Sequence, residues 1–302
     1  MRFVIFKIFL ILFFVSARAS DFSLNKDSLP PGWRGEVFKI SRSWSLPPVL
    51  QTISAFDFID ADHLACIQSA IGSIFIFDLS KKSIESEIPF ASPGDYKGIA
   101  IVDNTAFIAC ADGRILEVSD YRSEKPSVKE YGTNLTVRDD AEGICYDKKN
   151  ARLLVCIKGD AEEPKIEKGI YSFDLASRSM SIKPVLTIDL RDTILNKGDS
   201  KRLQTLILPS DIDIDPLTQW VYVCDAMKSQ VLVMDENGKM KSLFIFDRDN
   251  MIQPEGIKFT PSGELFIASE GFNESPGKIL MIASAVPRSG IVPVVEQGVE
   301  NE

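Results

Sequence analysis

The chain has 302 residues, of which 45% are hydrophobic and 25% charged, and this is the composition of a globular protein rather than a disordered one. Its 34 Lys and Arg against 43 Asp and Glu give a net charge of -9, so we do not expect the basic face that binds nucleic-acid phosphates. The single histidine, His63, excludes zinc sites built from several histidines.

Residues 1–19 have the features of a signal peptide. Arg2 and Lys7 make the start basic, residues 8–15 form an apolar run, and Ala17-Arg18-Ala19 is a small-x-small cleavage site. The apolar run is short for a bilayer span, although an uncleaved anchor is the alternative. We therefore expect cleavage after Ala19, export to the periplasm or the outside, and no membrane span in the mature chain.

Five cysteines occur, an odd number, and most lie within apolar runs that resemble strands. They are Cys66, Cys110, Cys145, Cys156 and Cys224. A cysteine inside a strand behaves as a small buried hydrophobe. The pattern predicts core thiols rather than a disulfide framework, and Cys145 with Cys156 is the one pairing that we would check.

A repeat organises the chain from residue 54 onward. Its copies begin at residues 54, 97, 142, 210 and 255, and the clearest are EGICYDKKNARLLVCIKGD from Glu142 and EGIKFTPSGELFIASEG from Glu255. Each copy is an apolar strand, a polar turn and a second apolar strand, followed by a third and often a fourth strand candidate. Four strands at a period of about 40–45 residues are typical of a β-propeller blade.

The predicted fold is therefore an all-β propeller of five blades, each with four antiparallel strands. Residues 46–285 form the propeller domain, residues 20–45 an N-terminal segment with a closing strand, and residues 286–302 a flexible C-terminal tail. The strand within residues 36–44 is expected to complete the last blade, because closure removes exposed sheet edges. Six blades, or an unrelated β-sandwich, are the alternatives.

Polar residues of the repeat are predicted to meet at one mouth of the central channel. In an antiparallel hairpin the start of the first strand lies beside the end of the second. This places Lys97 at the mouth in the second copy, and Glu142 beside Lys158 in the third, where a salt bridge is expected. These three residues are the candidate ligand-binding residues.

The fourth and fifth copies carry acidic residues at both places. Asp211 is paired with Asp225, and Glu255 with Glu270. Four carboxylates in one sector repel one another, and a hard cation with oxygen ligands would relieve this repulsion, so Ca²⁺ is the candidate cofactor. A solvated acidic rim without a metal is the alternative, because no calcium-loop spacing is present.

Three motifs carry a resemblance to a known family. The run from Glu142 to Lys158, the start Pro209-Ser210-Asp211-Ile212, and Gln253-Pro254-Glu255-Gly256-Ile257 occur in this order. They resemble the SdiA-regulated (YjiK-like) family over about residues 46 to 283. The resemblance implies an exported propeller that binds calcium, and it implies no established reaction.

Three functions remain open. The first is a binding module for a small molecule or a protein, with the acidic mouth as the site. The second is a calcium-dependent hydrolase of phosphate or carboxylic esters, in which a metal-bound water attacks the substrate. The third is a scaffold for another exported protein. No Walker loop, dinucleotide fingerprint or nucleophile elbow is present, so no catalytic residue can be named.

Overall fold

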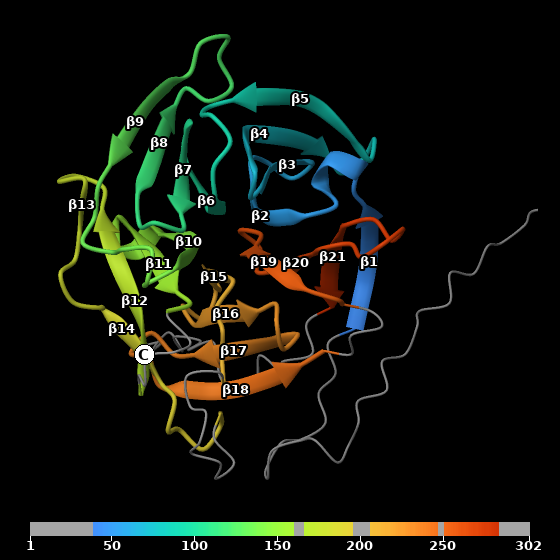
Figure 1. Cartoon of the computed structure of the whole chain (residues 1–302). Coiled ribbons are helices and arrows are strands. Elements are labelled where there is room, and N and C mark those ends of the chain that lie inside the picture. The colour runs from blue at the N-terminus through green and yellow to red at the C-terminus, as the bar shows by residue number, and fades with distance from the viewer. Residues whose placement is uncertain (1–38, 160–165, 196–205, 247–250, 284–302) are drawn as a thin grey trace, which may run out of the picture.

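The computed structural model describes residues 39–159, 166–195, 206–246 and 251–283. Five β-sheets stand around a central axis, and the chain passes through them in order (Figure 1). The predicted signal peptide, most of the N-terminal segment and the C-terminal tail lie outside the described residues. Within the described residues, no helix has the length and hydropathy needed to cross a membrane.

Blades 1, 2 and 4 are each a meander of four consecutive antiparallel strands. Blade 1 is β2 (Ile53–Phe58), β3 (His63–Gln68), β4 (Ile71–Asp78) and β5 (Ser83–Pro89). Blade 2 is β6 (Tyr96–Val102), β7 (Thr105–Cys110), β8 (Ile115–Ser119) and β9 (Ser127–Tyr131). Blade 4 is β15 (Asp211–Ile214), β16 (Val221–Asp225), β17 (Gln230–Met234) and β18 (Met240–Ile245).

Blade 3 departs from this scheme at its outer edge. Its first three strands are β10 (Ala141–Asp147), β11 (Arg152–Ile157) and β12 (Glu167–Asp174). Two short strands, β13 (Ser179–Met180) and β14 (Leu186–Asp189), both pair with β12 and share the fourth position. Two 3-10 helices, η2 (Pro48–Leu50) and η3 (Lys148–Asn150), are the described helical elements.

Blade 5 joins the two ends of the propeller. It consists of β19 (Pro254–Phe259), β20 (Leu265–Ser269), β21 (Lys278–Ala283) and, from the start of the chain, β1 (Lys39–Ser45). β1 pairs antiparallel with β21, and Trp44 faces Ile279 in the register. The predicted closure of the ring by an N-terminal strand is confirmed, and in Figure 1 the first and last strands lie side by side.

The hydrophobic core is divided among the interfaces between blades. Five clusters of buried side chains are present, and each joins residues of two neighbouring blades. The inner strands are buried on both faces because both faces of each sheet are covered, whereas β5 at an outer edge is mostly exposed. The five-bladed prediction is confirmed, and all five cysteines are buried, free thiols.

Candidate functional site

Bulges at the start of the inner strands place the polar residues of the repeat at one mouth of the ring. The pairing register shifts between Ile53 and Ala55, Tyr96 and Gly98, Ala141 and Ile144, and Pro254 and Gly256. The residues skipped in the register include Ser54, Lys97, Glu142 and Glu255. A bulge takes a residue out of the regular alternation and re-aims its side chain. The alternation of apolar and polar residues in the sequence did not predict these bulges.

Glu142 is the centre of a charged group on blades 2 and 3. Its Oε1 lies 2.8 Å from Lys158 Nζ and 3.9 Å from Lys97 Nζ. Lys97 Nζ also lies 3.1 Å from Asp95 Oδ1. Burial raises the pKa of Glu142, and the two lysines oppose that rise. The predicted salt bridge between Glu142 and Lys158 is present, and Lys97 joins it.

Glu255 and Glu270 lie near this group on blade 5. Burial raises the pKa of Glu255 to about 8, the negative charges of Glu270 and Glu142 add to the rise, and Lys158 and Lys97 oppose it. Burial also raises the pKa of Glu270. Within the described residues, neither carboxylate accepts a hydrogen bond or forms an ion pair. The two groups are therefore available to a ligand, and a cation would favour their ionised forms. We call Lys97, Glu142, Lys158, Glu255 and Glu270 the mouth cluster.

Asp211 lies deeper, at the contact of blades 4 and 5. It is fully buried, and its Oδ2 accepts hydrogen bonds from Lys258 Nζ and the Ile257 backbone N–H, both at 2.9 Å. Lys258 Nζ also donates to the carbonyl oxygens of Ile144 and Ile212, each at 3.1 Å. The Lys258 ammonium is therefore the counter-charge of Asp211 at Oδ2, while the buried Oδ1 has no hydrogen-bond partner within the described residues.

The repeat explains why Asp211 is not at the mouth. Asp211 aligns with Gly143 and Gly256 of the neighbouring copies, and Ser210 aligns with Glu142 and Glu255. A Cβ on Gly143 would lie 2.3 Å from the Cα of Asp211, so the two backbones touch at this level. Asp211 therefore lies one position further along its strand than Glu142 and Glu255 and, in contrast to the prediction, is buried below the mouth.

Two more carboxylates surround Lys258 that the sequence analysis did not single out. Burial raises the pKa of Asp57 to about 6 and that of Asp213 to about 7, while the charge of Lys258 lowers both. Asp57 accepts a hydrogen bond from Ile101 N–H at 2.7 Å. Asp57, Asp213 and Lys258 share one position of the repeat, directly after an apolar residue, and this alignment could have identified them.

Asp225 is also committed to internal partners. Its Oδ2 accepts hydrogen bonds from Leu208 N–H and Gln230 Nε2, both at 2.9 Å, and its Oδ1 accepts one from Lys228 N–H at 3.0 Å. The carboxylate therefore holds two loops in place. Of the four predicted metal ligands, the structure leaves Glu255 and Glu270 open, and the assignment of calcium to the full set stays a prediction.

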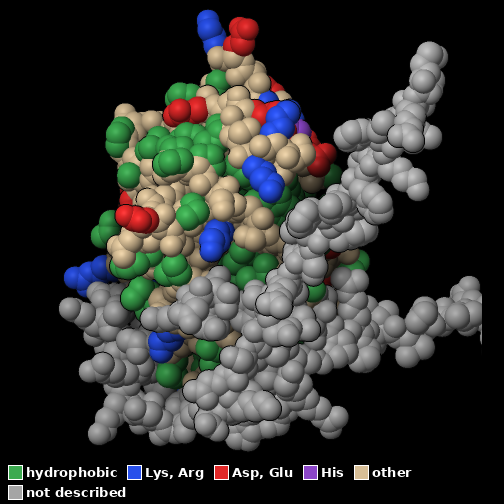
Figure 2. All heavy atoms as spheres, turned by 90° about the vertical axis from the view of Figure 1, so that its right-hand side faces the viewer, with side chains coloured by type: hydrophobic (Ala, Val, Ile, Leu, Met, Phe, Trp, Pro, Cys, Tyr) green, Lys and Arg blue, Asp and Glu red, His purple; other side chains and the backbone are tan. Residues whose placement is uncertain are grey.

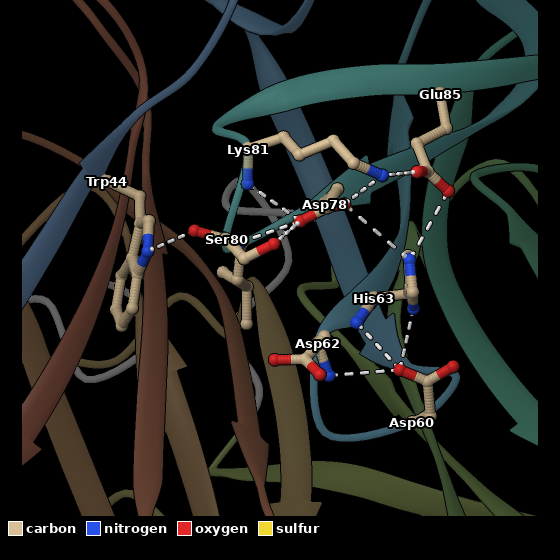
Figure 3. Close-up of polar contacts among 9 residues, drawn as sticks. Trp44, Asp60, Asp62, His63, Asp78, Ser80, Lys81 and Glu85 are labelled. Atoms are coloured by element: carbon tan, nitrogen blue, oxygen red, sulfur yellow. Dashed lines mark hydrogen bonds and ion pairs between the residues drawn. The ribbon is translucent and has the colours of Figure 1, made fainter.

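A second charged group lies on blade 1 (Figure 3). His63 Nδ1 is 2.8 Å from Asp60 Oδ1, and His63 Nε2 is 3.3 Å from Glu85 Oε2 and 3.8 Å from Asp78 Oδ2. Within the described residues, His63, Asp78 and Glu85 are the one trio of metal-binding side chains whose atoms lie within 4.8 Å. Lys81 Nζ already bridges Asp78 and Glu85, so this group is a network of ion pairs.

Comparisons with known proteins agree with the fold. No family model and no curated protein matches the sequence. The crystal structure of Myxococcus xanthus glutaminyl cyclase superposes with a TM-score of 0.56 and 13% identity, covering 81% of this chain and 94% of that chain. A protein of unknown function from Bacteroides caccae gives a TM-score of 0.42 and 12% identity, over 70% of this chain and 66% of the other. The chain is thus similar to glutaminyl cyclase in its propeller architecture.

Proposed function

We propose that this propeller is a binding module that takes a cation, or a ligand carrying one, at the mouth cluster. The observation that supports the proposal is the pair Glu255 and Glu270, two partly buried carboxylates whose pKa values are raised by burial and which have no hydrogen-bond or ion-pair partner within the described residues; the charge of Glu270 raises the pKa of Glu255 further. Neighbouring acids are usually neutralised by protons, lysines or bound cations. Here the nearby lysines are already engaged by Glu142.

The charge around the mouth also favours a positive ligand. The electrostatic neighbours of Lys97 and Lys158 include Asp95, Asp140, Glu142 and Glu255. Carboxylates therefore outnumber ammonium groups even before Glu270 is counted. Their field attracts cations toward the mouth and repels anions.

Calcium fits this donor set better than zinc does, because the open ligands are carboxylate oxygens. Glu255 and Glu270 would hold the ion, and Glu142 could join them only by giving up Lys158. Two protein carboxylates predict weak binding, in the range of extracellular calcium modules. This proposal accords with the calcium binding that the resemblance to the SdiA-regulated family implies.

The test is calorimetric titration of residues 20–302 with CaCl₂ and, separately, with n-butylammonium chloride. We expect saturable binding of one of the two probes, and a loss of at least about tenfold in the Glu255→Gln/Glu270→Gln variant. Binding should strengthen between pH 6 and pH 9, because Glu255 must lose its proton to face a cation.

The matched control is Glu87→Gln, which removes one negative charge from the exposed outer strand β5. It should bind as the wild type does. Failure of both probes to bind at millimolar concentration would rule out the cation site, as would calcium binding that survives in the double variant.

A second candidate is acid catalysis at the same place. A carboxyl group with a pKa near 8 is mostly protonated at neutral pH and can donate a proton to a leaving group. Ester hydrolysis is one reaction to assay, with p-nitrophenyl acetate and p-nitrophenyl phosphate. Ammonia release from a glutaminyl peptide is another, because the superposed structure from Myxococcus xanthus is named a glutaminyl cyclase.

Turnover that disappears in Glu255→Gln and persists in Glu87→Gln would support catalysis. The direction of the pH profile separates the two candidates. Proton donation by Glu255 is lost as the pH rises through about 8, whereas cation binding is gained over the same range.

A further inference from the structure

A cleft of about 630 Å³ lies between blades 1 and 5, where the ring closes. Its walls include the turn between β2 and β3 and the turn between β19 and β20. Both turns follow the ends of inner strands, whereas the mouth cluster stands at their starts, so the cleft opens on the opposite face of the ring. None of the mouth residues lines it.

One wall of the cleft is aromatic. The rings of Trp44 and Phe266 stack with their centroids 5.8 Å apart, and Phe58 meets Phe266 edge-on at 5.0 Å. Trp44 Nε1 donates a hydrogen bond to the Leu79 carbonyl oxygen at 2.9 Å, which fixes the indole. Met281 adds a flexible apolar side chain. The wall is therefore set in place before any ligand arrives.

The facing turn presents two carboxylates. Asp60 Oδ1 accepts hydrogen bonds from Asp62 N–H and His63 N–H, both at 2.9 Å, and lies 2.8 Å from His63 Nδ1. The Asp62 carbonyl accepts a hydrogen bond from Leu79 N–H at 2.8 Å, so the turn is held at both ends. In Figure 3 the Asp62 carboxylate points away from His63, toward the side where Trp44 lies.

Three carboxylate oxygens on this turn are available to a ligand. Within the described residues, Asp60 Oδ2 and both oxygens of the Asp62 carboxylate accept no hydrogen bond and form no ion pair. Partial burial raises the pKa of Asp60, but the bonds from Asp62 and His63 outweigh it, and the net shift is downward. Asp60 is thus a fixed negative charge at neutral pH.

The other charged residues that line the cleft leave its net charge negative. Glu264 contributes a third carboxylate, and Arg42 on β1 contributes the one guanidinium among the lining residues. Figure 2 views the ring from the side of the closing strand. It shows acidic and basic side chains scattered among hydrophobic ones over the described surface on this side.

We propose that this cleft is a second binding site, for a small organic cation with an apolar body. The ammonium group lies against Asp60 and Asp62, and the hydrocarbon or ring packs on Phe58, Phe266 and Trp44. Aromatic faces and carboxylates both attract a cation, and the volume suits a small molecule. The rigid turn and the fixed indole reduce the entropy lost on binding.

The test compares two probes with the same apolar body and opposite charge, 4-phenylbutylammonium and 4-phenylbutyrate. Calorimetric titration of residues 20–302 at low ionic strength should show the ammonium compound binding at least about tenfold more tightly. Binding should also change the intrinsic fluorescence, because Trp44 lines the cleft.

Two variants locate the binding. Asp62→Asn should weaken the ammonium probe roughly fivefold, as loss of an exposed charge partner does. Ser262→Trp, which places a large ring in the cleft from an exposed turn, should abolish binding. Glu124→Gln, an exposed acid on blade 2, is the control for the change in net charge.

The Glu255→Gln/Glu270→Gln variant separates this proposal from that for the mouth. It should retain full affinity for 4-phenylbutylammonium. Equal affinity for the two probes, no binding of either, or unchanged binding in Ser262→Trp would overturn the inference. Loss of binding in the mouth variant would assign the probe to the mouth and overturn it as well.

Discussion

Lysine and carboxylate side chains lie close together at two levels of this propeller. At one level a buried carboxylate is paired with a lysine, and at the other two carboxylates are left without a partner within the described residues. At the level of Lys258, the ammonium is enclosed by Asp211 and by two backbone carbonyls from other blades. At the mouth, Glu255 and Glu270 lie near other carboxylates and have no hydrogen-bond or ion-pair partner within the described residues. Both levels are lined by the inner strands, so the strand position alone does not distinguish them.

The difference shows what makes a buried carboxylate structural. Asp211 receives a lysine and a backbone amide, and it joins blades 3, 4 and 5 through Lys258. Glu255 has no hydrogen bond or ion pair within the described residues, and burial together with the charges of Glu270 and Glu142 raises its pKa to about 8 against the opposing charges of Lys158 and Lys97. A carboxylate whose charge is stabilised by partners within the fold helps to hold the ring together. A carboxylate that lies among other carboxylates, without a partner, is available to a ligand.

Removing Lys258 should have the largest effect. Lys258→Met leaves Asp211 buried without a counter-charge, and we expect a loss of about 3–5 kcal/mol in the free energy of unfolding, measured with urea. The loss should shrink at acidic pH, where Asp211 can take up a proton. Lys258→Met/Asp211→Asn should recover much of the stability, and Arg191→Met, at an exposed ion pair, should cost far less.

Asp225 should have the next largest effect, because it tests whether that carboxylate is structural. Asp225→Ala leaves three donors without their acceptor and should cost about 2–3 kcal/mol in urea unfolding. Asp112→Ala, at the corresponding end of β7, removes a half-exposed pair with Arg114 and should cost less than about 1 kcal/mol. If folded Asp225→Ala no longer binds calcium while Glu255→Gln/Glu270→Gln still does, Asp225 would be a ligand and the distinction between it and the two mouth carboxylates would be wrong.

Glu255 should contribute to the pH dependence of the free energy of unfolding. Its pKa is higher in the folded protein than in the unfolded chain, so the folded state binds the proton more tightly and this contribution to stability falls from about pH 4.5 to pH 8. Glu255→Gln should therefore gain stability relative to the wild type as the pH rises through that range. Urea unfolding at pH 5, 7 and 8.5 measures the gain, and Glu87→Gln should run parallel to the wild type.

The smallest expected effect is at His63, at the edge of the second proposed site. Its hydrogen bond with Asp60 raises its pKa, burial opposes the rise, and the charges of Asp60, Glu85 and Asp78 support it. The raised pKa means that protonated His63 stabilises the fold below about pH 6.5, and that this contribution disappears as the pH rises through the folded pKa. His63→Gln should lower stability at pH 5.5 by less than about 1 kcal/mol, and by less still at pH 8.5. A larger loss at pH 8.5 would contradict the assigned sign.

Pattern in the sequence was enough to predict five blades, with six as the alternative, and also the closing strand, the core thiols and the pair Glu142–Lys158. These follow from local pattern, since period-2 alternation defines strands and an antiparallel hairpin brings the start of one strand to the end of the next. Only the tertiary structure shows which carboxylates have hydrogen-bond or ion-pair partners. Lys258 bonds to Ile144, 114 residues away, because blades 3 and 5 both reach the axis. Strand pattern predicts which residues turn inward, but their partners come from other blades, and only the closed ring brings those blades together.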